Sequence, residues 1–169
     1  MLRAAVDPVT SHVNIARPRE EVFDYLADIA NHPEFSDHYL KHWRLLRIDS
    51  VGRGAGARFR VDAPFQRFGW ADMTFVEVDR PYRILAMGRG GKFNRNKTFS
   101  SWVLTPASGG GTHVEFTTET EPALISDRLM EGLGFRRWFR RGSRKAMRRL
   151  QSILEEDHGR GARATVAGL

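Results

Sequence analysis

Five stretches in the centre of the chain decide the fold, because only short turns separate them. In chain order they are VGRGAGARFRVDA (51–63), FGWADMTFVEVD (68–79), RPYRILAMG (80–88), NKTFSSWVLTP (96–106) and THVEFTTETE (112–121). Within them apolar and polar side chains alternate as they do in strands, and the turns contain glycine, aspartate or proline. Since a parallel crossover needs roughly a dozen residues or more, these turns predict antiparallel neighbours in one curved sheet.

The residues before this region predict two more strands and two short helices. Strands are expected at 9–15 and at about 41–48, which brings the sheet to about six or seven strands. Between them, Arg17-Pro18 opens a first helix, because proline suits the first turn and the two glutamates that follow suit the positive end of the helix dipole. Pro33 ends that helix, and a second short helical turn is expected at 34–38.

The sequence after Pro122 returns to a helical pattern. Apolar residues recur three or four positions apart over about 35 residues, which predicts one long C-terminal helix. These residues are Ile125, Leu129, Leu133, Met147, Leu150 and Leu154. Glycines interrupt the pattern at Gly132, Gly134 and Gly142, so a bend is expected near Gly132–Gly134, where loosening would admit a ligand.

The composition favours one domain and removes several kinds of chemistry. With 169 residues and 41% hydrophobic content, we expect one domain over 1–157 and a disordered tail over 158–169, where apolar periodicity is lacking. The absence of cysteine excludes disulfides, thiolate metal sites and thiol nucleophiles. No apolar run is long enough to span a bilayer and the N-terminus has no signal-peptide core, so we expect a soluble cytoplasmic protein.

The positive charge of the chain is concentrated in one segment. The formal net charge is +7, and the segment from 136 to 149 holds eight bases and no acid. These bases are Arg136, Arg137, Arg140, Arg141, Arg144, Lys145, Arg148 and Arg149. On a helix they form two adjacent rows of like charge, which is unfavourable unless something negative lies nearby. This segment is either a helix face that water solvates or a contact with an anionic membrane. Nucleic acid is disfavoured as its partner because the rest of the chain is slightly acidic.

The order of these elements resembles the START-like helix-grip superfamily, also called SRPBCC, in which a curved sheet wraps the last helix. The segments that carry the resemblance are Ile15-Ala16-Arg17-Pro18 with Val22-Phe23, Val51-Gly52-Arg53-Gly54, the stretch from Val76 to Ile84, and Trp102-Val103-Leu104-Thr105-Pro106. Within the superfamily, the chain is most similar to the polyketide cyclase/dehydrase-like group, which includes coenzyme Q-binding and lipid-transfer relatives. The resemblance implies an α+β fold with a cavity between the long helix and the sheet.

Such a cavity implies a hydrophobic small-molecule partner, for example a lipid, a quinone or a polyketide-like compound. Large apolar residues of the sheet and of the last helix are its candidate lining: Phe59, Trp70, Phe75, Phe99, Trp102, Phe116, Leu129 and Leu133. Because strands alternate, about half of the sheet residues must face outward instead. Burial of apolar ligand surface alone gives useful affinity, so no cofactor is expected.

An enzymatic alternative depends on polar residues between these aromatics. If Trp70 faces the cavity, period two places Asp72 there as well, and Ser100 takes the corresponding position beside Trp102. A carboxyl group in an apolar pocket has a raised pKa and can move a proton, which makes Asp72 the candidate acid of a cyclase or dehydratase. The other interpretation places Asp72 on the solvent face of its strand.

A short stretch rich in histidine is the last candidate site. His32, His38 and His42 lie close together in the sequence, with two carboxylates between them. Their spacing matches no usual zinc pattern and Pro33 interrupts the helix that would align them, so we expect no metal. These histidines are expected to pack at the junction between helix and strand.

Overall fold

The computed structural model describes residues 7–64, 69–121 and 134–167. Over these residues the chain forms the strands and helices that follow, in chain order. They are β1 (Val9–Ile15), α1 (Arg19–Ala27), η1 (Ile29–Asn31), α2 (His32–Ser36), β2 (Leu40–Leu45), β3 (Gly56–Val61), β4 (Trp70–Asp79), β5 (Arg83–Gly90), η2 (Lys92–Asn94), β6 (Asn96–Pro106), η3 (Ser108–Gly110), β7 (Thr112–Glu121) and α4 (Arg136–Glu156).

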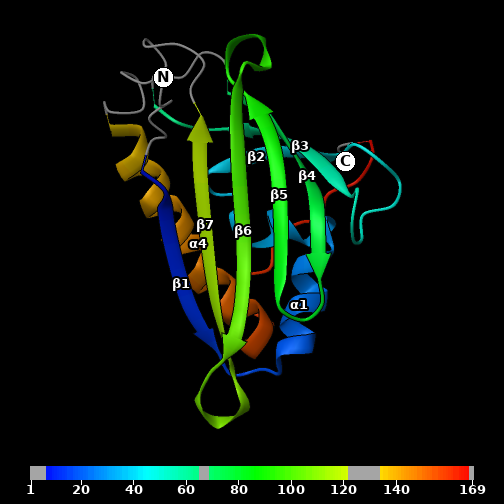
Figure 1. Cartoon of the computed structure of the whole chain (residues 1–169), viewed down its shortest axis with the longest axis vertical. Coiled ribbons are helices and arrows are strands. Elements are labelled where there is room, and N and C mark those ends of the chain that lie inside the picture. The colour runs from blue at the N-terminus through cyan, green and yellow to red at the C-terminus, as the bar shows by residue number, and fades with distance from the viewer. Residues whose placement is uncertain (1–6, 65–68, 122–133, 168–169) are drawn as a thin grey trace.

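The strands form one seven-stranded sheet in the order β1-β7-β6-β5-β4-β3-β2, and every pairing is antiparallel. Helix α4 runs across one side of the curved sheet, and α1 lies beside its lower end (Figure 1). The predicted α+β helix-grip fold, with two short helices after the first strand, is confirmed. The register shifts within β2, between Lys41 and Arg44, and within β4, between Phe75 and Glu77. Such bulges bend a sheet and increase its twist, which favours the concave face that holds the helix.

At the lower end of the molecule, near the tip of the arrow of β1 in Figure 1, apolar side chains of the sheet and of α4 are buried. Ile15 of β1, Leu104 of β6 and Val114 of β7 are each at most 1% exposed, and so are Leu150 and Ile153 of α4. We call this region the closed end. Burial of this apolar surface is the main contribution to holding α4 against the sheet.

Arg17, the residue before Pro18, links three elements at the closed end through its hydrogen bonds. Its Nε donates to the carbonyl of Leu154 at 2.8 Å, in the last turn of α4. The hydroxyl of Thr112 donates to the carbonyl of Arg17 at 2.8 Å. The start of α1, the start of β7 and the C-terminus of α4 are therefore tied together.

Two of the glycines in the predicted long helix have roles that differ from a bend. Gly134 has a φ of +99°, a left-handed conformation that favours glycine, and α4 begins only at Arg136. Regular α-helix therefore begins just after this glycine, and Gly132 lies outside the described residues. Gly142 is buried inside α4, where an added Cβ would stand 2.7 Å from Cδ2 of Tyr39. Glycine here permits close packing of the helix on Tyr39.

The C-terminal segment differs from the expected disordered tail, because residues 157–167 lie along η1, α2 and the end of β2. Backbone amides of Gly161 and Ala164 donate to the carbonyls of Glu34 and Ala30 at 3.0 and 2.9 Å. The amide of Leu45 donates to the carbonyl of Thr165 at 2.9 Å. The order of this segment could not be predicted from apolar periodicity, because backbone hydrogen bonds and ion pairs hold it in place.

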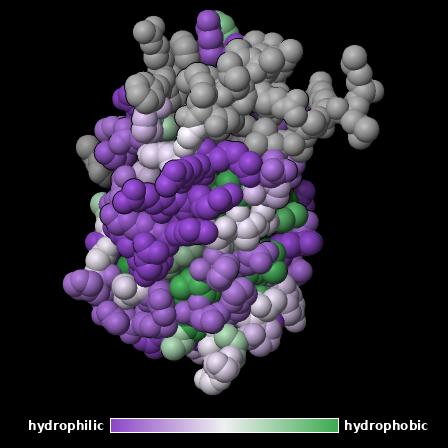
Figure 2. Space-filling view, turned by 90° about the vertical axis from the view of Figure 1, so that its left-hand side faces the viewer, coloured by the Kyte–Doolittle hydropathy of each residue, from purple (hydrophilic) through white to green (hydrophobic). Residues whose placement is uncertain are grey.

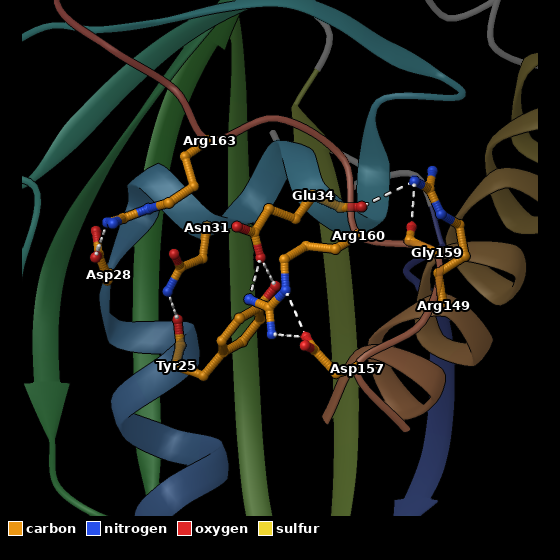
Figure 3. A network of polar contacts seen from close by, with 9 residues as sticks. All are labelled: Tyr25, Asp28, Asn31, Glu34, Arg149, Asp157, Gly159, Arg160 and Arg163. Carbon is orange, nitrogen blue, oxygen red and sulfur yellow. Dashed lines mark hydrogen bonds and ion pairs between the residues drawn. The ribbon is translucent and has the colours of Figure 1, made fainter. Parts of the chain in front are cut away.

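The same segment covers a buried carboxylate (Figure 3). Glu34 is 2% exposed, and its Oε2 accepts hydrogen bonds from the hydroxyl of Tyr25 at 2.6 Å and from Nη1 of Arg160 at 2.9 Å. Arg160 also binds Asp157, and Arg163 pairs with Asp28 at 2.5 Å. A buried charge must be paired, so this network fixes both the tail and helix α2.

No helix in the described part of the chain is both long enough and apolar enough to cross a membrane.

Candidate functional site

The upper half of the concave face encloses a cavity of about 130 Å³ between α4, α2 and the sheet. Three groups of described residues form its walls: the region of α2, the strands of the sheet with Asp7 before β1, and the segment from Phe135 to Met147 at the start and middle of α4. A dry apolar cavity of about 150 Å³ is known to hold a benzene ring, so the enclosed space suits a body of about one six-membered ring.

The wall near α2 comes from His32, Phe35, Ser36 and Tyr39. These residues are spaced i, i+3, i+4 and i+7, the spacing of one helix face, because Pro33 occupies the first turn of α2 and does not interrupt it. Their alignment was accessible from the sequence, but the expected break at Pro33 concealed it.

His32 is the most deeply buried titratable group of this wall. Its Nε2 lies 2.8 Å from the carbonyl of Leu26, which can only accept, so Nε2 carries the hydrogen. Burial lowers the pKa of His32 to about 4, so the imidazole is neutral at pH 7 and Nδ1 is an acceptor. The ring packs edge-on against Trp102, with centroids 5.1 Å apart.

The sheet wall changes from aromatic to hydroxylated along β6 and β7. Deepest in the cavity, Trp102 faces Phe116 across the two strands, and their ring centroids are 4.9 Å apart. The next inward-facing pairs toward the upper end are Ser100 with Thr118 and Thr98 with Thr120. The hydroxyls of Ser100 and Thr118 are 2.9 Å apart. We call these four residues, Thr98, Ser100, Thr118 and Thr120, the hydroxyl ladder.

The upper end of the cavity carries charge. Arg136, in the first turn of α4, contributes to the lining together with Asp7. Nη2 of Arg136 donates to the carbonyl of Asp7 at 2.7 Å, and Nη1 lies 3.4 Å from Oδ2 of Asp7. Along β6 and β7 the wall therefore becomes more polar from the aromatic floor to the upper end, whereas Phe135 and Phe139 keep the α4 side apolar.

The predicted ligand-binding residues fall into four groups. Phe59, Trp102 and Phe116 line the cavity. Phe75 also faces inward, but it is fully buried behind the lining, with its ring 5.6 Å from that of His32. Leu129 and Leu133 lie outside the described residues.

Trp70 and Phe99 are not among the residues that line the cavity. Trp70 is 40% exposed, and its ring stands 6.0 Å from the guanidinium of Arg58. Phe99 alternates with the inward-facing Thr98 and Ser100, which directs its side chain to the outer face of β6. The alternation was visible in the sequence, but the choice of inner face in β4 was not.

Asp72 alternates with Ala71 and Met73, both of which pack toward the core, so its carboxylate belongs to the outer face of β4. There its Oδ1 accepts a hydrogen bond from the backbone amide of Arg89 at 3.2 Å. Asp72 therefore borders the cavity as a residue of β4, but its carboxylate points to the outer face. The enzymatic hypothesis needs a different proton carrier.

The three histidines near α2 occupy different surroundings. His32 lines the cavity, whereas Nε2 of His38 donates to the carbonyl of Gly142 at 3.0 Å and its Nδ1 lies 3.1 Å from Nη1 of Arg149. Burial is the main cause that lowers the pKa of His38. His42 is exposed near Trp70. Over residues 7–64, 69–121 and 134–167, no group of three or more His, Asp or Glu side chains is placed to hold a metal ion.

The eight bases of the segment 136–149 divide into two held and six exposed residues. Arg136 is held by Asp7, and Arg149 pairs with Asp37 at 2.5 Å and donates to the carbonyl of Glu34 at 2.8 Å. The exposed ones, which we call the basic face, are Arg137, Arg140, Arg141, Arg144, Lys145 and Arg148. Figure 2 looks at the side of the molecule that carries α4 and shows a broad field of strongly hydrophilic side chains there.

A curved antiparallel sheet that grips a long helix around a largely aromatic cavity defines the START-like class, a fold that binds hydrophobic ligands. Residues 8–155 match the family described as polyketide cyclase / dehydrase and lipid transport, and the chain belongs to that family. A comparison with curated proteins gives no match.

Solved structures with the same fold are distant in sequence. The KanY protein (ms6282) has a TM-score of 0.71 at 18% identity, over 89% of this chain and 98% of that one. TTHA0849 from Thermus thermophilus has a TM-score of 0.67 at 14% identity, over 88% and 97%. Truncated norcoclaurine synthase from Thalictrum flavum has a TM-score of 0.66 at 13% identity, over 90% and 96%. At these identities the likeness concerns the fold.

Proposed function

We propose that this protein binds a small amphiphilic molecule whose apolar body, about one ring in size, enters the cavity first while its polar end remains at the hydroxyl ladder. The observation that carries the proposal is the polarity gradient along the β6 and β7 wall. Trp102 and Phe116 form the floor, and hydroxyl pairs follow toward the upper end. In the ladder the hydroxyl of Ser100 binds that of Thr118, which donates to the carbonyl of Phe99 at 3.3 Å. The oxygen of Ser100 therefore keeps lone pairs that a polar ligand group can use and an apolar ligand cannot.

The expected affinity is moderate. A buried ring removes roughly 200 Å² of apolar surface from water, which is worth about 5 kcal/mol before the costs of association. Each hydrogen bond from the ladder to a ligand oxygen adds about 1 kcal/mol. One structural neighbour, norcoclaurine synthase, has been solved in complex with dopamine and hydroxybenzaldehyde, and both molecules consist of a ring with polar groups. That neighbour supports the proposed ligand size.

The binding of p-cresol and of toluene tests this proposal, because the two differ by one hydroxyl. Quenching of tryptophan fluorescence reports on both, since Trp43 and Trp102 line the cavity. We expect p-cresol to bind more tightly. Ser100→Ala combined with Thr118→Val should weaken p-cresol binding about fivefold to tenfold and leave toluene within about twofold.

Thr117→Val is the matched control, because Thr117 lies on the other face of β7, where its hydroxyl is 3.0 Å from that of Thr10. This variant should change neither affinity. If the wild-type protein binds neither compound, the proposed function is wrong. If the double variant weakens both compounds equally, the ladder does not orient the ligand.

A cyclase or dehydratase activity remains the second hypothesis, and His32 supports it better than Asp72 does. A neutral imidazole in the cavity wall can accept a proton through Nδ1, whereas the carboxylate of Asp72 lies on the outer face. The test is exchange of the α-hydrogens of cyclohexanone for deuterium, followed by NMR. Catalysed exchange that His32→Gln abolishes supports the hypothesis, and exchange no faster than in buffer contradicts it.

A further inference from the structure

We propose that the basic face of α4 docks this protein onto an anionic lipid bilayer, with the upper end of the cavity next to the lipid surface. The first step of the argument is geometric. At about 100° per residue, Arg137, Arg140, Arg141, Arg144, Lys145 and Arg148 fall within an arc of about 140°. They therefore point outward from one side of the helix.

The second step concerns ion pairing within the part of the chain that the structure describes. Among the described residues, none of the six forms an ion pair, although Arg136 and Arg149 of the same helix do. No acid occurs on α4 before Glu155. Like charges four residues apart disfavour a helix, so the basic face weakens the isolated fold. An external anionic surface removes this repulsion.

The third step concerns the aromatic residues at the start of the helix. Phe135 and Phe139 line the upper part of the cavity beside Arg136, and Trp138 is half-buried between the cavity and the basic face. Bases next to aromatic side chains are typical of helices that lie at a membrane interface. A docked helix would therefore hold the upper end of the cavity beside the lipid.

The fourth step adds a separate element, the turn between β5 and β6. Phe93 in η2 is 85% exposed, and Nζ of Lys92 stands 5.3 Å from its ring centroid. In Figure 1 this turn and the first residues of α4 both lie at the upper end of the molecule. An exposed aromatic ring beside a lysine suits insertion at a lipid headgroup boundary, and it has no role in contact with a nucleic-acid backbone. The two elements together favour a bilayer.

Vesicle flotation tests the docking directly. The full chain is mixed with vesicles of phosphatidylcholine alone, or with about 30% phosphatidylglycerol, at low and at moderate salt. We expect binding only to the anionic vesicles and marked loss of binding as salt rises. The variant Arg137→Gln/Arg141→Gln/Arg148→Gln should lose about 100-fold in affinity, because each base near an anionic surface contributes about fivefold.

The matched control removes the same charge elsewhere. Arg44→Gln/Arg53→Gln/Arg60→Gln alters three exposed bases on or next to β2 and β3, at the far edge of the sheet from α4. Near-normal vesicle binding of this control supports the proposal, and an equal loss in both triple variants overturns it. Phe93→Ser should weaken binding about tenfold without changing its salt dependence.

Two further outcomes separate this proposal from its alternatives. Tighter binding to a short DNA duplex than to anionic vesicles at the same salt would overturn the lipid assignment. The idea that the cavity takes up a ligand at the lipid surface rests on the proposed function, whereas docking through the basic face is independent of it. Ser100→Phe, which fills the cavity, should abolish p-cresol binding and leave vesicle binding unchanged. Loss of both would contradict the separation of the two sites.

Discussion

The two ends of the concave face use the same elements to opposite effect. At the closed end, β1, β6, β7 and the second half of α4 bring together aliphatic side chains such as Leu104 and Leu150, which are at most 1% exposed. At the cavity end, the same strands carry Trp102, Phe116 and the hydroxyl ladder, and the first half of α4 carries Phe139. Complementary aliphatic shapes fill space completely, whereas large rings opposite short hydroxyl side chains leave a gap.

The two ends of one sheet therefore have different roles, because one contributes to stability and the other to ligand binding. The closed end should account for most of the packing energy, while the cavity end gives up part of it to hold a ligand. Helix α2 and Tyr39 lie at the boundary, because they touch the cavity on one side and the C-terminal segment or α4 on the other. Substitutions at the two ends and at the boundary can therefore test the comparison.

The largest effect is expected from removal of an aliphatic side chain at the closed end. Leu150→Ala leaves a void among fully packed neighbours, so the free energy of unfolding should fall by about 3 to 4 kcal/mol. Met73→Ala only enlarges an existing cavity and should cost about 1 to 2 kcal/mol. Urea unfolding of the two variants measures both values. Equal losses would mean that the cavity end is as tightly packed as the closed end.

The next effect is pH dependence from His32. Its folded pKa of about 4 lies below the ordinary value of 6.5, so the unfolded chain binds the proton first as pH falls. Stability from this group is complete above pH 6.5 and declines toward pH 4, by about 3 kcal/mol in total. Urea midpoints between pH 7.5 and 4.5 should drop less steeply in His32→Gln. The exposed His42→Gln is the control and should keep the wild-type slope.

A third prediction addresses the outer support of α2. Arg160→Gln leaves the buried carboxylate of Glu34 with the hydroxyl of Tyr25 as its remaining side-chain partner. Removal of one partner of a buried pair costs about 3 to 5 kcal/mol, but Arg160 is 41% exposed, so solvent reduces the expected loss to about 2 kcal/mol. In a double-mutant cycle with Glu34→Gln, a coupling energy near zero would show that the C-terminal segment does not support α2.

The architecture followed from local patterns, whereas the site required contacts between distant segments. Alternation and short turns predicted the strands, including β1 at its observed bounds, because both signals act between neighbours in the chain. Alternation alone does not say which face of β4 is concave. From the sequence Trp70 is therefore a candidate for the cavity lining and Asp72 fits either the cavity or the solvent face, whereas in the structure both side chains lie outward. That choice depends on how the sheet curves around α4, a contact between distant residues.

The hydroxyl ladder was present in the sequence as a pattern of small polar residues. Thr98 precedes Ser100 and Trp102 at period two, and Thr118 and Thr120 follow Phe116 in the same way. A search for large apolar lining residues passes over these four hydroxyl side chains. The docked C-terminal segment had no such signal, because its arginines find their carboxylates on α2 and in the residue after α1.

The smallest change in stability is expected at Gly142, at the boundary between the two ends. Alanine in place of glycine favours a helix by about 1 kcal/mol, but its Cβ would stand 2.7 Å from the Tyr39 ring and must displace it. These effects oppose each other, so the free energy of unfolding of Gly142→Ala should stay within about 1 kcal/mol of the wild type. The ring of Tyr39 lines the cavity, so p-cresol affinity should change more clearly, falling several-fold as the ring moves inward.

Ser152→Ala makes the comparison specific, because it raises helix propensity on the same helix away from Tyr39. It should alter stability slightly and p-cresol affinity not at all. If Gly142→Ala lowers stability by several kcal/mol and leaves ligand affinity intact, Tyr39 belongs to the packed core of the closed end. If affinity falls while stability is kept, the boundary lies at Gly142, and α4 serves packing on one side of it and ligand binding on the other.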